Sequence, residues 1–187
     1  MIMLEDGMYL YHGSYTPVEV IDLDKCMPHK DFGKGFYVTS SIEQARDFIH
    51  LSLSRARARR MVPRDTRIGH VSTYKLKNAD DLQIEYFRHA DRRWLHFVVG
   101  NRDGEYFAEL IERYARHDVI VGKIANDRTA TTLQAYMENV YGEIGTVSAD
   151  ERAIATLLPN KLENQICFRT WKAVARLEFV GSESYEQ

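Results

Sequence analysis

The amino-acid sequence predicts one domain of mixed α+β structure that spans residues 1–187. A single domain usually has about 100 to 200 residues, and this chain lies within that range. Hydrophobic residues make up 44% of the chain and charged residues 28%, which is ordinary for a folded globular protein. Strand-like runs and helical stretches follow one another without a regular strand–helix–strand order, and this irregular order favours a mixed α+β domain.

Strands are predicted where short apolar runs end at turn residues. In chain order these runs are residues 8–11, 36–39, 68–76, 119–124, 165–168 and 177–180. The first run, Met8-Tyr-Leu-Tyr11, stops at His12-Gly13-Ser14, so we expect His12 at the end of a strand. Gly33 and Gly35 predict a tight loop before the second run, because glycine lets the backbone approach other groups closely.

Helices are predicted where apolar residues recur at helical spacing. They are a helix that begins at Ile42 and the segments 89–101, 105–113, 129–140 and 149–158. Ser40 or Ser41 is expected to cap the first helix, with Glu43 close behind as in a capping box. A short turn is expected at residues 171–176.

Charge and cysteine content narrow the class of protein. The formal net charge of -2 and the pI of about 6.4 neither require nor exclude a nucleic-acid partner. Cys26 and Cys167 lie far apart, without metal-ligand or redox spacing, which is typical of free thiols in a reducing compartment. The first ten residues lack a signal-peptide pattern and no run of 18 apolar residues occurs, so we expect a cytoplasmic protein with no membrane partner.

Three strings near the start of the chain lie at an informative spacing. They are Tyr11-His12-Gly13-Ser14, then Asp31-Phe-Gly-Lys-Gly-Phe-Tyr37, then Phe48, eleven residues after Tyr37. Their combination resembles the NAD-binding core of the poly(ADP-ribose) polymerases and of the wider diphtheria-toxin-like ADP-ribosyltransferases. The resemblance covers the first quarter of the chain and implies a split mixed β-sheet core with surrounding helices. A lone His-Gly-Ser string would be an ordinary turn at the end of a strand.

A second resemblance spans nearly the whole chain. Trp94-Leu-His-Phe-Val98, residues 118–127 and Asn164-Gln-Ile166 are similar to signatures of a bacterial family that shares this core. That family has glutamine where the transferases have a glutamate. What it implies about activity comes through the transferase core alone.

The resemblance implies that six residues contact NAD, which is the substrate. These residues are His12, Gly13, Ser14, Gly35, Tyr37 and Phe48. His12 would hydrogen-bond the adenosine ribose, with a further hydroxyl from Ser14, and Gly13 would offer its backbone to the nicotinamide carboxamide. Tyr37 and Phe48 would stack on the two faces of the nicotinamide ring. An aromatic face attracts such a flat cation by about 0.5 to 2 kcal/mol.

The third motif differs from the transferase pattern. Lys161-Leu-Glu-Asn-Gln165-Ile-Cys-Phe168 resembles the strand that carries the transferase glutamate, and Gln165 lies at the glutamate position. A glutamine orients a ribose by hydrogen bonds, but it lacks the charge that stabilises the oxocarbenium-like transition state. Glu163 and Asp127 are the candidates to supply a carboxylate; each is also explained as a solvated residue, or as a helix cap in the case of Asp127 or Asn126.

The predicted function is transfer of ADP-ribose from NAD to a macromolecule, a protein or a nucleic acid. The catalytic candidates are His12, Tyr37, Gln165 and Asp127. The resemblance implies a bacterial intracellular toxin or defence effector, with an antitoxin protein as a further partner. Two alternatives stay open, which are a catalytically weak NAD-binding or ADP-ribose-binding module and an NAD glycohydrolase.

Other charged residues give weaker indications. The histidines lack the spacing of a zinc site, so no metal is expected. Arginines cluster in residues 55–67, where a solvated helix face is the favoured interpretation over a surface that guides a nucleic acid. Lys30, Lys34 and Arg55 are alternative candidates to neutralise the NAD pyrophosphate.

Overall fold

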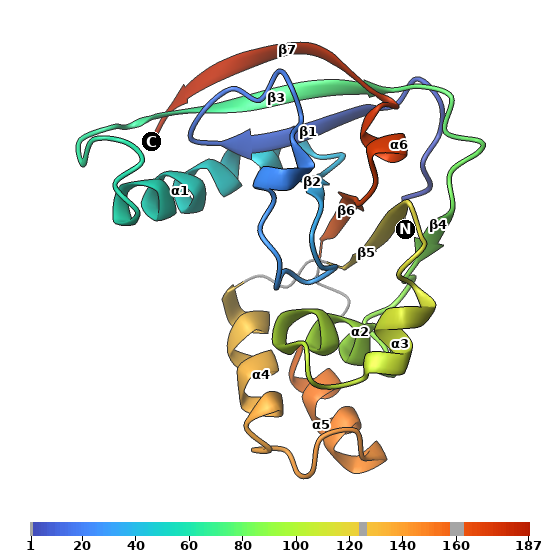
Figure 1. Cartoon of the computed structure of the whole chain (residues 1–187). Helices are drawn as coiled ribbons and strands as arrows, with labels where there is room; N and C mark the ends of the chain where they lie inside the picture. Colours follow the sequence, from blue (N-terminus) through green and yellow to red (C-terminus); the bar gives the residue numbers. More distant parts are fainter. Residues whose placement is uncertain (1, 124–126, 158–162) are drawn as a thin grey trace.

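The computed structural model describes residues 2–123, 127–157 and 163–187 (Figure 1). The strands are β1 (Tyr9–Ser14), β2 (Phe36–Val38), β3 (Ile68–Leu76), β4 (Ile84–Tyr86), β5 (Val119–Lys123), β6 (Asn164–Phe168) and β7 (Leu177–Glu186). The helices are η1 (Leu23–Lys25), α1 (Ile42–Ala58), α2 (Arg92–Asp103), α3 (Ala108–Arg113), α4 (Asp127–Met137), α5 (Val147–Leu157) and α6 (Trp171–Val174). The prediction of mixed α+β structure is therefore confirmed.

The described strands form two sheets that meet at β1 and β2. One sheet has the order β1-β3-β7 and is antiparallel throughout. The other has the order β2-β6-β5-β4, with β4 parallel to β5 and the remaining pairs antiparallel. Reciprocal backbone hydrogen bonds of 2.8 and 2.9 Å between Tyr11 and Thr39 connect the two sheets. This bridge brings β1 beside β2.

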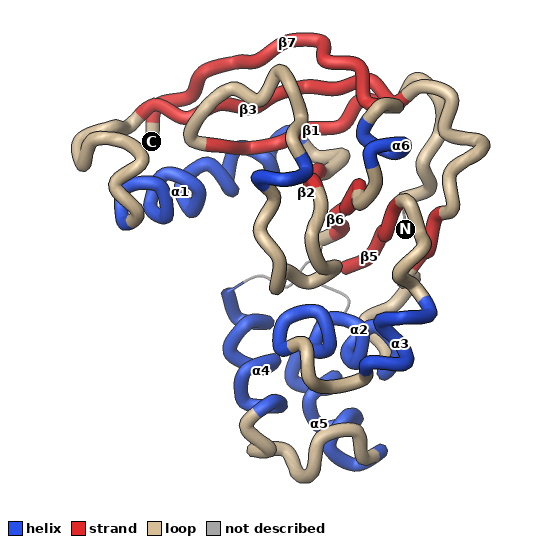
Figure 2. The backbone as a smooth tube through the Cα atoms, viewed as in Figure 1, coloured by secondary structure: helices blue, strands red, loops and turns tan. Residues whose placement is uncertain are grey.

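The sheets separate three groups of buried side chains. Between the sheets lie residues that alternate with outward-facing ones along each strand, among them Leu10, Phe36, Val38, Tyr74, Val121, Ile166 and Phe168. On the outer face of β1 and β3, α1 packs through Ala45, Ile49 and Leu53 against Val71 of β3. On the opposite face of the second sheet, Ile120 and Cys167 join a helical core with Trp94, Leu95, Phe97, Leu133, Tyr136 and Ala149. Figure 2 shows helices α2 to α5 gathered below the strands, with α1 and the short α6 next to the upper sheet.

The structure changes several predicted elements. His12 lies inside β1 and not at its end, because pairing with β3 continues past Gly13 to Ser14. The three-residue strand β4 is absent from the sequence prediction, since so short a segment carries no alternation pattern. A helix, α6, occupies the predicted turn and is capped by Thr170, whose Oγ1 accepts a 3.1 Å hydrogen bond from the Ala173 amide. Strand β7 runs further than predicted because it pairs with the whole length of β3.

Some predicted features fall outside the described residues. These are the end of the strand predicted at 119–124, the end of the helix predicted at 149–158, Asn126 and the start of the third motif at Lys161. Within the described part of the chain, no helix combines the length and apolarity needed to cross a membrane.

Candidate functional site

The side chain of His12 reaches from β1 across to β2. Its Nδ1 lies 2.7 Å from the backbone oxygen of Tyr37, and its ring centre lies 4.6 Å from that of Phe36. A carbonyl oxygen only accepts hydrogen bonds, so Nδ1 carries the hydrogen and Nε2 of the neutral ring is left as an acceptor. Burial lowers the pKa of His12 below its ordinary value of 6.5, against the opposing effect of the Tyr37 carbonyl. The neutral ring that can accept from a hydroxyl is therefore the favoured form at neutral pH.

Tyr37 holds the glycine-rich loop by its hydroxyl group. The hydroxyl donates to the backbone oxygen of Gly33 at 2.7 Å and accepts from the amide of Phe32 at 3.0 Å. Burial and nearby groups raise the pKa of Tyr37 well above its ordinary value, so it remains a phenol. Tyr37 pairs with Cys167 across β2 and β6, which puts both on the sheet face that carries Gln165. Burial raises the pKa of Cys167 to about 12, so this thiol is not a nucleophile near neutral pH.

Gln165 is part of a buried polar network with two residues that the sequence did not single out. Its Nε2 donates to Oδ2 of Asp31 at 3.0 Å, and both residues are 8% exposed. Oδ1 of Asp31 accepts from Nε and Nη2 of Arg102 at 2.8 and 2.6 Å. Arg102 belongs to α2, so the network joins β6, the glycine-rich loop and the helices. A carboxylate therefore contacts the residue at the glutamate position.

The two carboxylates that the sequence predicted, Glu163 and Asp127, differ from Asp31 in their positions. Glu163 is exposed and precedes β6, two residues before Gln165. Asp127 begins α4, and its side chain lies outside the described part of the structure. Asp31 could have been found from its position at the head of the glycine-rich string. Arg102, 71 residues further along, carried no sequence signal.

Packing explains two of the glycines predicted to contact NAD. A Cβ on Gly13 would lie 1.8 Å from the backbone oxygen of Ala45, because α1 crosses β1 at that point. A Cβ on Gly35 would lie 2.5 Å from Sγ of Cys167. Ser14, at the end of β1, is 6% exposed. The fold itself thus requires both glycines, whether or not a ligand approaches them.

Phe48 lies on the outer side of α1. It is 37% exposed, and the guanidinium carbon of Arg55 lies 6.0 Å from its ring centre. Among the described residues, no ring contact joins Phe48 to Tyr37. The predicted stacking of nicotinamide between these two rings stays a prediction.

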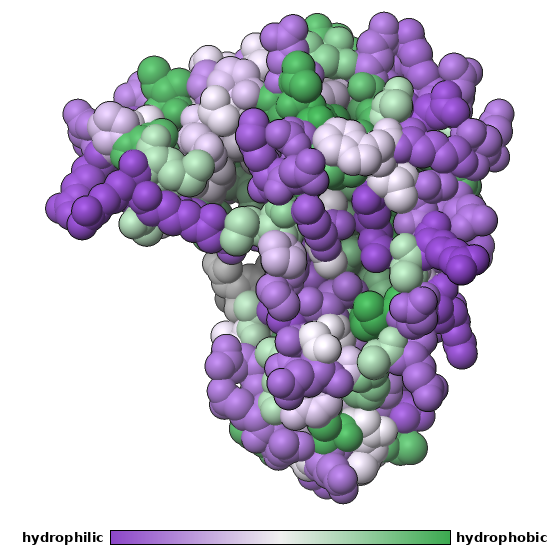
Figure 3. Space-filling view, in the orientation of Figure 1, coloured by the Kyte–Doolittle hydropathy of each residue, from purple (hydrophilic) through white to green (hydrophobic). Residues whose placement is uncertain are grey.

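The arginine-rich segment forms the outer end of α1 and the loop after it, a hydrophilic projection in Figure 3. Arg57 is tied down, since its Nε donates to the backbone oxygen of Thr66 at 3.0 Å. Burial lowers the pKa of Lys30, and the charge of Arg55 adds to this effect. The positive end of α1 therefore acts electrostatically on the loop that carries Asp31. The interpretation as a solvated face and the interpretation as a phosphate-binding surface both stay open.

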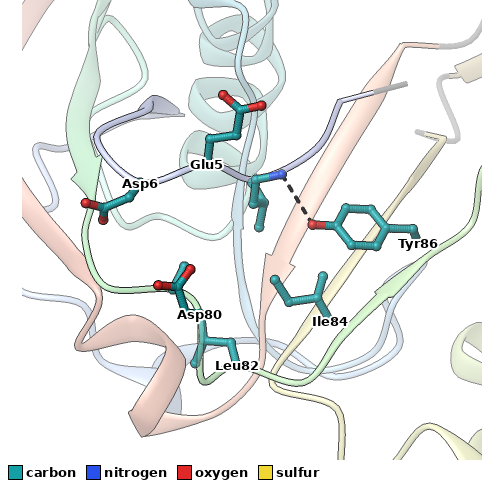
Figure 4. A pocket seen from close by; sticks show the side chains of 8 residues that line it. Glu5, Asp6, Asp80, Leu82, Ile84 and Tyr86 are labelled. Atoms are coloured by element: carbon teal, nitrogen blue, oxygen red, sulfur yellow. Dashed lines mark hydrogen bonds between the residues drawn. The ribbon is translucent and has the colours of Figure 1, made fainter.

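A surface hollow of about 530 Å³ lies elsewhere in the fold (Figure 4). It is lined by Leu4, Glu5, Asp6, Ala79, Asp80, Leu82, Ile84 and Tyr86. Strand β4, which contributes to it, is at the opposite edge of its sheet from β2, so no predicted NAD-binding residue lines the hollow. Within the ranges that the structure describes, no group of three His, Cys, Asp or Glu side chains is arranged to hold a metal.

Comparison with family models identifies the family. Residues 8–179 match the model described as "Protein of unknown function (DUF3990)". The chain belongs to the DUF3990 family. The match includes His12, Tyr37, Asp31, Arg102 and Gln165, so the network described above lies within the DUF3990 domain. A comparison with curated proteins finds no match.

Proposed function

We propose that this DUF3990 protein is an NAD-dependent ADP-ribosyltransferase, with an ADP-ribosyltransferase-like split sheet. One observation carries the proposal: β1 is bridged to β2 and β2 pairs with β6, so the three strands that carry His12, Tyr37 and Gln165 lie side by side. These are the residues at the His, Tyr and Glu positions of the motif. The support is that the three strings lie on adjacent strands, because their order along the sequence alone would allow them to be far apart.

The reaction would break the bond between nicotinamide and its ribose. The electron pair of that bond leaves with nicotinamide, and a nucleophile of the acceptor then bonds to the ribose carbon and loses its proton. His12 Nε2 would accept a hydrogen bond from the adenosine ribose, and Gly13 and Ser14 would add contacts to the nicotinamide and ribose. Tyr37, with Phe48 on the other face, would hold the nicotinamide ring. Gln165 would orient the reacting ribose.

The proposed setting is a bacterial cell, where the protein acts as a toxin or defence effector in the cytoplasm. The acceptor would be a protein or a nucleic acid, and an antitoxin protein would be a further partner. Resemblance to the transferases supports this part of the proposal. The charges on the outer end of α1 are compatible with a phosphate-bearing acceptor.

Substitution of the two motif residues tests the proposal. Tyr37→Ala removes one stacking face, so we expect the dissociation constant for NAD to rise about fivefold to thirtyfold. His12→Ala removes the hydrogen-bond acceptor, and we expect a similar loss. Calorimetric titration with NAD and detection of released nicotinamide measure both effects.

Two exposed residues of the same types give matched controls. Tyr9→Ala and His50→Ala alter exposed side chains outside the three motifs and should leave NAD binding unchanged. A well-folded wild type that neither binds NAD nor releases nicotinamide would contradict the proposed function.

The network around Gln165 favours one alternative function, which is a module that binds NAD or ADP-ribose without catalysis. The amide at the glutamate position is bound to a buried ion pair and carries no charge of its own. Binding of NAD without release of nicotinamide would support this alternative. Formation of free ADP-ribose without a modified macromolecule would indicate a glycohydrolase.

A further inference from the structure

Asp31 controls which end of the Gln165 amide is presented to the candidate site. The two ends of a glutamine amide have similar shapes, and only one of them donates. Asp31 is held as an ion pair by the two nitrogens of Arg102, and an ionised carboxylate only accepts. The neighbour of Asp31 must therefore be the Gln165 amino group, 3.0 Å away. Oε1 of Gln165 is turned away from Asp31 as a result.

The remaining end of the amide is the end available to accept a further hydrogen bond. In the part of the chain that the structure describes, no protein group donates a hydrogen bond to Oε1 of Gln165. Gln165 is 8% exposed, so a small part of the residue reaches solvent. A hydroxyl group of a ligand is the natural partner for such an oriented acceptor.

We propose that Asp31 is a positioning residue that fixes Gln165 Oε1 as the acceptor for a hydroxyl of the nicotinamide ribose of NAD. The inference rests on the proposed function and explains how an amide takes the role of a carboxylate. Oε1 of Gln165 accepts a hydrogen bond as a carboxylate oxygen of glutamate does. The negative charge lies on Asp31, on the far side of the amide from Oε1, and is partly neutralised by Arg102.

The proposal predicts coupling between positions 31 and 165. Asp31→Asn weakens the orientation of the Gln165 amide. An asparagine side chain both donates and accepts, so either end of that amide can pair with it. Gln165→Glu brings two carboxylates to about the distance of the present hydrogen bond, where like charges disfavour ionisation of both. The double variant restores a hydrogen bond of reversed polarity. In it the introduced asparagine donates to the introduced glutamate, whose other oxygen is then the acceptor for the ribose hydroxyl.

A double-mutant cycle on the full chain measures this coupling. We expect each single variant to lose about tenfold in NAD affinity, or in kcat for nicotinamide release with KM little changed. The double variant should recover to within about threefold of the wild type, since coupled contacts are non-additive. Losses that add in the double variant would overturn the proposal, as would an Asp31→Asn variant that binds and turns over NAD like the wild type.

A matched control separates positioning from stability. Asp118 is also buried and accepts hydrogen bonds from the Gln83 amide and the Thr170 hydroxyl, but it precedes β5, away from Gln165. Asp118→Asn should lower the thermal midpoint without changing NAD affinity. If Asp31→Asn behaves in the same way, its role is structural and the proposal is overturned. A wild type without NAD binding overturns the proposed function together with this inference, whereas a wild type that binds NAD without coupling overturns only the inference.

Discussion

At the scale of single residues, the protonation of His12 links the candidate site to the stability of the fold. Burial lowers the pKa of His12 in the folded chain, below the value of 6.5 that the unfolded chain has. As the pH falls, His12 of the unfolded chain therefore becomes protonated near pH 6.5, whereas His12 of the folded chain becomes protonated only at a lower pH. The free energy of unfolding should fall as the pH drops from 7 toward the folded pKa, by at most about 1.4 kcal/mol per pH unit for one proton.

Comparison with a variant isolates this contribution. His12→Asn keeps an NH group near the Tyr37 carbonyl but does not titrate, so its stability should fall less steeply between pH 7 and pH 5. Urea unfolding at a series of pH values measures the difference in slope. His50→Asn, at an exposed position on α1, is the control and should keep the slope of the wild type. Equal slopes for the wild type and His12→Asn would show that His12 titrates alike in both states.

Sequence reasoning found the motif residues but not the network around them. His12, Tyr37 and Gln165 belong to strings of recognisable order, and neighbouring strands bring two of these strings into contact. The pair of Asp31 and Arg102 depends on how α2 packs beneath the glycine-rich loop, and no local pattern encodes that packing. The sequence instead offers Glu163, which would share a strand face with Gln165, and Asp127, at the end of a predicted strand, as candidate carboxylates.

At the scale of elements, the contact of α1 with β1 gives Gly13 a structural role. A Cβ there would overlap the backbone oxygen of Ala45, and a backbone atom moves only if the helix moves. We expect Gly13→Ala to lower the free energy of unfolding by about 2 to 3 kcal/mol, because overpacking of this kind forces backbone shifts. Chemical denaturation measures the loss.

Gly181 is the matched control for this substitution. It lies in β7, and nothing lies within 4 Å of the position its Cβ would take, so Gly181→Ala should change stability by about 0.5 kcal/mol or less. If Gly13→Ala keeps its stability and loses only NAD affinity, then close approach of a ligand is the reason for the glycine.

Elements with strong local signals were predicted best. Ser41 caps α1 as expected, since its Oγ accepts from the Gln44 amide at 3.1 Å. Strand β4 escaped prediction because it exists through pairing with β5, which lies more than 30 residues away in the chain. The bridge between Tyr11 and Thr39, which joins the two sheets, likewise has no local signature.

At the scale of the whole molecule, one buried aspartate ties the helices together. Asp150 of α5 is fully buried and accepts from Arg92 at 2.6 Å, from His96 at 2.9 Å and from the hydroxyl of Tyr136. Burial alone raises the pKa of Asp150, but the hydrogen bonds from Tyr136, His96 and Arg92 outweigh it and leave this pKa lowered. The carboxylate thus joins α2, α4 and α5 beneath the second sheet.

Removal of this carboxylate tests whether the helices and sheets unfold as one unit. Asp150→Ala leaves three donors without their acceptor, so we expect a loss of about 3 to 5 kcal/mol in the free energy of unfolding. Because Ile120 and Cys167 of the second sheet share the core of the helices, the sheets should be destabilised together with them. Asp47→Ala, on the exposed side of α1, should change stability by about 0.5 kcal/mol or less.

Two spectroscopic probes distinguish cooperative from separate unfolding. Trp94 is fully buried among the helices, and Trp171 is 55% exposed, so a Trp171→Phe background lets fluorescence report on Trp94 alone. Far-UV circular dichroism follows all helices and strands. If the chain is a single domain, the fluorescence and the dichroism change at the same urea concentration. This should hold in the Trp171→Phe parent and in the same protein with Asp150→Ala. If Trp94 became exposed at a lower urea concentration than that at which the dichroism is lost, the helices would be a separate folding unit and the prediction of one domain would be wrong.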